Sequence, residues 1–66
     1  MSVAKVIEIT ARSPESFEAA IREGIAKAGE TVENIQHAYV DGQQVVVEND
    51  TPVQFQVDLK ITFLVN

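Results

Sequence analysis

The last third of the chain alternates between apolar and polar residues. From Val53 to Val65 every odd position is apolar, while positions 54 to 62 carry Gln, Asp, Lys or Thr at every even position. A period of two over this length predicts one long β-strand with a buried face and a polar face. The odd face needs an apolar layer against it, whereas the even face is suited to water or to a partner.

One predicted helix supplies the apolar layer. Small and apolar residues recur at helical spacing and form a single stripe: Phe17, Ala20, Ile21, Gly24, Ile25 and Ala28. Ser13 is the expected N-cap, with Pro14 at the first helical position, and Gly29 is placed to end the helix. We therefore expect the stripe to pack on the odd face of the last strand.

Two further strands are predicted. Residues 3–11 are rich in β-branched side chains, and a second strand begins near Ile35. The turn into the last strand has two candidate positions, residues 41–42 and residues 49–52. We favour the second, because residues 43–48 are too few and too apolar for a separate exposed strand. The favoured second strand is then long, and bent or bulged at Gly42.

These elements predict an α+β fold. A β-α-β crossover followed by a hairpin gives a β-α-β-β chain with a three-stranded antiparallel sheet in the order 1-3-2. One helix covers one face of that sheet. Residues 1–66 are expected to form a single domain.

The small size of the chain favours self-association. A domain of 66 residues buries only about 60% of its unfolded surface, and small domains compensate with disulfides, a metal or oligomerisation. The sequence has no cysteine and one histidine, so disulfides and a histidine-rich metal site are excluded. A homo-oligomer is the remaining route to stability.

Charge excludes several kinds of partner. The formal net charge of −5 is unsuited to nucleic acid or to an anionic membrane surface. The first five residues do not resemble a signal peptide, and no segment is long enough to span a bilayer. A cytoplasmic location is the resulting expectation.

Residues for catalysis are sparse. His37 is the only candidate base, and no serine lies near it on the predicted strand. The three glycines do not have the spacing of a phosphate-binding loop. Asp41, Glu48 and Asp50 are candidate oxygen ligands for a cation such as calcium, but they match no known loop pattern, which favours solvated turn charges. We expect a protein that is not an enzyme.

His37 has two interpretations. The pattern alone favours a half-exposed histidine with a structural role on the second strand. A flat ring that stacks and hydrogen-bonds a ligand is the alternative. Tyr39 adds a second ring on the same face, although paired aromatics on a strand more often pack than bind.

Four segments, in order, resemble the dodecin family. They are residues 3–9 (VAKVIEI), 13–20 (SPESFEAA), 31–35 (TVENI) and 55–63 (FQVDLKITF). No single segment is diagnostic, but together they cover nearly the whole chain. The resemblance implies a hollow dodecamer in which flavins, FMN or riboflavin, bind in stacked pairs between subunits. It also implies storage or sequestration of flavin without turnover.

The resemblance also implies three ligand-site residues. Gln56 matches the glutamine that hydrogen-bonds the polar edge of the flavin ring. His37 stands where typical members have a stacking tryptophan, and Gln44 stands where many bacterial members have an arginine that holds a phosphate. Losing a good stacking partner weakens binding by about 1–3 kcal/mol, which is roughly one or two orders of magnitude in affinity.

Three hypotheses about function remain. The first is a flavin-binding dodecin in which His37 replaces the tryptophan less effectively. The second is a dodecin-like oligomer that binds another small molecule or a cation such as calcium. The third is an assembly scaffold whose polar sheet face is only an interface.

Overall fold

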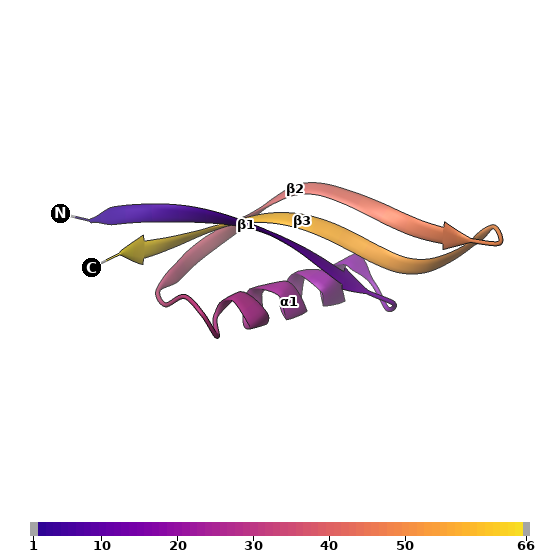
Figure 1. The fold of residues 1–66 in the computed structure, drawn as a ribbon, viewed down its shortest axis with the longest axis horizontal. Coiled ribbons are helices and arrows are strands. Elements are labelled where there is room, and N and C mark those ends of the chain that lie inside the picture. Colours follow the sequence, from indigo (N-terminus) through magenta and orange to yellow (C-terminus); the bar gives the residue numbers. More distant parts are fainter. Residues whose placement is uncertain (1, 66) are drawn as a thin grey trace.

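The computed structural model describes residues 2–65 and contains one helix and one antiparallel sheet (Figure 1). The elements are β1 (Val3–Ser13), α1 (Phe17–Ala28), β2 (Ile35–Glu48) and β3 (Thr51–Val65). The strand order is β1-β3-β2, so the last strand lies in the middle. The predicted α+β fold and strand order are confirmed.

The hairpin between β2 and β3 turns at Asn49 and Asp50. Both residues have positive φ, 50° and 61°, and Glu48 pairs with Thr51 directly outside them. Two positive φ angles in a two-residue loop are typical of a type I′ turn, whose twist suits a hairpin. The favoured turn position is confirmed, but the turn is shorter than predicted. Pro52 lies in β3 opposite Val47 rather than in the turn.

A bulge interrupts β2 at Asp41. Val40 pairs with Leu59 and Gly42 pairs with Asp58, so Asp41 is an extra residue on β2. An extra residue reverses which positions of a strand face a given side of the sheet. His37, before the bulge, and Gln44, after it, therefore lie on the same face. The predicted bend or bulge at Gly42 is confirmed, although the extra residue is its neighbour Asp41.

The predicted start of the helix is wrong. The N-cap is Ser16, whose extended backbone places its Oγ 3.0 Å from the donating N–H of Ala19. Ser13 remains in β1, paired with Phe55 and buried, and its Oγ accepts from the N–H of Glu15. β1 ends directly before Pro14, because proline has no N–H to continue the hydrogen bonds of the strand. Gly29 ends the helix as predicted, with its N–H donating to the carbonyl of Ile25.

The core lies between α1 and the face of the sheet formed by β1 and β3. Its buried side chains on β3 are the odd residues Val57, Leu59 and Ile61, as the alternation predicts. The helix meets them with its smallest residues, Ala20, Gly24 and Ala28, while its larger ones are only half buried. At one end of the core Phe17 packs edge-on against Phe55, with 5.2 Å between ring centres.

The molecule is elongated. Its extents are 52 × 19 × 14 Å, and the hairpin of β2 and β3 continues well beyond the helix (Figure 1). Val45 and Val47, which pair with Phe55 and Pro52 toward the hairpin turn, are 41% and 54% exposed. Among residues 2–65, no helix is long and apolar enough to cross a lipid bilayer.

Candidate functional site

The face of the sheet opposite α1, here called the outer face, carries the predicted site residues. The sheet register arranges its side chains in rows across β1, β3 and β2. Three rows follow one another along β3: Val6, Thr62 and His37, then Glu8, Lys60 and Tyr39, then Thr10, Asp58 and Gly42. A fourth row contains Arg12, Gln56 and Gln44. Within residues 2–65, no helix covers these rows (Figure 1).

His37 and Tyr39 are exposed at one end of the outer face. His37 lies opposite Thr62, and Tyr39 lies opposite Lys60 and is 62% exposed. Two strand positions of the same parity place both rings on one side of β2. The structure thus brings together the two aromatic side chains that the sequence singles out, on a surface open to a ligand or a neighbour.

Gln56 and Gln44 face each other at the other end of the rows. They are cross-strand partners on β3 and β2, and Arg12 of β1 is the partner of Gln56 on its other side. Arg12 Nε donates a hydrogen bond to Gln56 Oε1 at 2.7 Å. Arg12 is not among the site residues that the sequence pattern or the family resemblance indicates. The antiparallel register between the first and last strands is the signal that would have found it.

One chain does not bring His37 and Gln56 together. His37 lies opposite Thr62, which is six residues from Gln56 on the same strand. At the usual rise of a strand, this separation is roughly 20 Å. A single small ligand that touches both side chains must therefore be shared between two subunits.

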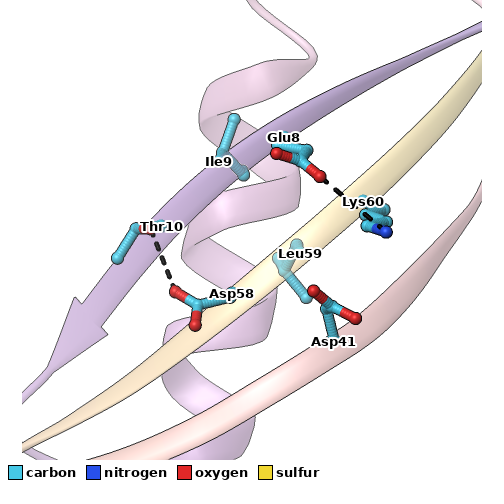
Figure 2. Close-up of a pocket in the computed structure, with 7 residues that line it drawn as sticks. All are labelled: Glu8, Ile9, Thr10, Asp41, Asp58, Leu59 and Lys60. Carbon is cyan, nitrogen blue, oxygen red and sulfur yellow. Dashed lines mark hydrogen bonds and ion pairs between the residues drawn. The ribbon is translucent and has the colours of Figure 1, made fainter.

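A shallow depression between the two ends of the rows holds most of the outer-face charge (Figure 2). Lys60 Nζ lies 3.8 Å from Glu8 Oε1, and Thr10 Oγ1 donates to Asp58 Oδ1 at 3.0 Å. Asp41, the bulge residue, points its carboxylate toward the same depression from β2 (Figure 2). The depression therefore combines three carboxylates with one ammonium group.

The sequence-predicted cation ligands do not converge. Asp41 is at the bulge in the middle of β2, whereas Glu48 ends β2 and Asp50 is in the hairpin turn. The second half of β2 therefore lies between Asp41 and the other two carboxylates. Within the described chain, residues 2–65, no three His, Cys, Asp or Glu side chains are grouped closely enough to hold a metal ion. A cation site in this protein would need carboxylates from more than one subunit.

Comparisons with known proteins agree with this architecture. The Dodecin family model matches residues 3–66. A calcium dodecin from Mycobacterium tuberculosis is 35% identical over 63 residues, covering 96% of this chain and 89% of that protein. The structures are similar as well. A solved calcium dodecin from the same organism matches this chain with a TM-score of 0.86 at 32% identity, covering 98% of this chain and 93% of that one.

Solved structures from other bacteria superimpose more closely. A dodecin from Streptomyces davaonensis has a TM-score of 0.94 at 28% identity, covering 98% of this chain and 96% of that chain. The tt0972 protein of Thermus thermophilus has the same TM-score at 26% identity, covering 100% and 97%. With the family model spanning nearly all its residues, the chain belongs to the dodecin family.

Proposed function

We propose that this protein assembles into a homododecamer that binds flavin, FMN or riboflavin, and stores or sequesters it without turnover. Membership of the dodecin family supports the assembly. The observation that carries the ligand proposal is the outer face, where Gln56, Gln44 and His37 lie on one uncovered side of the sheet. All of these residues are accessible to a ligand held between subunits.

Each site residue has a defined part in this proposal. Gln56 hydrogen-bonds the polar edge of the flavin ring, and His37 of another subunit stacks on its face. Gln44 contributes an uncharged amide beside Gln56. Because imidazole presents less aromatic surface than indole, stacking on His37 gives a modest affinity.

Quenching of flavin fluorescence tests the proposal. The assembled protein is titrated into riboflavin and into FMN, and saturable quenching at micromolar protein is the expected result. Gln56→Leu should weaken binding, whereas Gln54→Leu, the same change one row further along β3, should not. Colourless protein that quenches neither flavin would refute flavin binding.

Calcium is a second candidate ligand, favoured by one specific observation. The relative that is 35% identical is a calcium dodecin. In this chain the outer-face depression lined by Glu8, Asp41 and Asp58 is the acidic surface that two assembled subunits would combine into an oxygen-rich site.

Thermal unfolding tests calcium binding. Calcium should raise the melting temperature of the assembly, since a ligand that binds only the folded state stabilises it. Magnesium should not, because it requires near-ideal octahedral geometry and gives up its bound water reluctantly. Asp41→Asn should abolish the increase, while Asp50→Asn, in the exposed turn, should leave it unchanged. If neither flavin nor calcium binds, the remaining hypothesis is an assembly scaffold.

A further inference from the structure

Arg12 determines how Gln56 presents its side-chain amide. A guanidinium group has N–H donors and no acceptor. The atom of Gln56 that lies 2.7 Å from Arg12 Nε must therefore be the carbonyl oxygen Oε1. The amide NH₂ of Gln56 is consequently directed away from Arg12. Without Arg12, the amide would be free to rotate and present either its oxygen or its nitrogen.

The charges around Arg12 differ from those in the rest of the outer face. Lys60 is paired with Glu8, and Asp58 accepts from Thr10. Within residues 2–65, no carboxylate lies within 4 Å of the Arg12 guanidinium. The row of Arg12, Gln56 and Gln44 therefore carries a positive charge, although the whole chain has a formal charge of −5.

We propose that Arg12 is a specificity-determining residue of the ligand site, which holds Gln56 as a hydrogen-bond donor and makes the site prefer an anionic ligand to its neutral counterpart. This inference rests on the proposed flavin binding. The ligand offers Gln56 a carbonyl oxygen or an unprotonated ring nitrogen. The remaining guanidinium donors face the anionic group, for which a planar fork is a suitable partner.

A purely structural role would have different consequences. A contact that only ties β1 to β3 would change stability and affect all ligands equally. The Arg12–Gln56 hydrogen bond is exposed, and even ion pairs at exposed positions contribute little to stability. A preference between two ligands that differ only in charge is the property that separates the two roles.

Riboflavin and FMN supply this comparison, because they share a ring and differ by a phosphate. The dissociation constants of both are measured for the wild type and for three variants. Arg12→Met removes the donor and the charge, Arg12→Gln keeps a donor without charge, and Arg12→Lys keeps both. Melting temperatures are recorded for each variant to confirm that it is folded and assembled.

The wild type should bind FMN roughly fivefold more tightly than riboflavin, as expected from about 1 kcal/mol for an exposed charge pair. Added salt should reduce the preference. Arg12→Met and Arg12→Gln should abolish it, and Arg12→Lys should retain most of it. Arg12→Met should also weaken riboflavin binding, since Gln56 is no longer held.

Two results would overturn the inference in distinguishable ways. If the wild type binds flavin and Arg12→Met leaves both affinities and their ratio unchanged, Arg12 has no part in specificity while flavin binding stands. If the assembled wild type binds neither flavin, the proposed function and the role of Arg12 fail together.

Discussion

At the residue scale, His37 is the position that limits affinity in the proposed flavin site. The residue is exposed opposite Thr62, so a larger ring at this position meets no buried neighbour. We expect His37→Trp to bind FMN and riboflavin about 1–3 kcal/mol more tightly, which is a gain of roughly one or two orders of magnitude. Fluorescence titration of the assembled variant measures the change.

His37→Ala is the matched control for that substitution. Removing the imidazole should leave the melting temperature nearly unchanged and weaken flavin binding. Equal affinity of the Trp, Ala and wild-type proteins would show that position 37 does not contact the ligand.

Individual site residues were predictable from the sequence to different degrees. The position of Gln56 on the outer face follows directly from the alternation of β3. The shared face of His37 and Gln44 depends on the bulge at Asp41, since an unbroken strand would place them on opposite sides. Arg12 was missed because its contact with Gln56 depends on the exact register between two strands far apart in the sequence.

At the scale of elements, Gly24 sets how closely α1 approaches the sheet. A Cβ on Gly24 would lie 2.9 Å from Ala11 Cβ and 3.2 Å from Leu59 Cδ1. Gly24→Ala should therefore lower the melting temperature. Its overpacking cost of about 1–3 kcal/mol exceeds the gain of about 1 kcal/mol in helix propensity.

The second half of this test is a double-mutant cycle with Ala11→Gly. Removing the opposing Cβ should make Gly24→Ala much less destabilising, at the same protein concentration. Gly24→Ala that stabilises the protein in both backgrounds would show that the helix and sheet separate without cost.

The order and type of the elements were predictable because each has a strong local pattern. The alternation of β3 and the apolar stripe of α1 both survive in the structure. The helix start was misplaced because two serines precede the stripe and Pro14 made the first look like a cap. Tertiary pairing decides between them: Ser13 continues the ladder opposite Phe55, which leaves Ser16 to cap the helix.

At the scale of the whole molecule, one chain exposes more surface than a stable monomer of its size. Its accessible surface is 4776 Å², against about 4100 Å² expected for a folded monomer of this mass. Its radius of gyration is 13.5 Å, against about 11 Å for a compact domain of this length. The excess comes from the extended hairpin and the uncovered outer face, so further stability has to come from other subunits.

Val47 is the position where this dependence is most directly testable. It pairs with Pro52 close to the hairpin turn and is 54% exposed. We expect a neighbouring subunit to cover this side chain in the proposed dodecamer, so that a carboxylate there loses apolar contact and buries a charge. We expect Val47→Asp to shift the protein from the proposed dodecamer to smaller species in light scattering and to lower its melting temperature.

Thr51→Asp adds the same charge beside the same turn but replaces an exposed polar residue, so it should leave the assembly intact. The comparison separates lost apolar contact from added charge, because both variants have the same net charge. A wild-type protein that remains a folded monomer at micromolar concentration would contradict the need for assembly. It would also show that the surface left open by a single helix is stable in water without a partner.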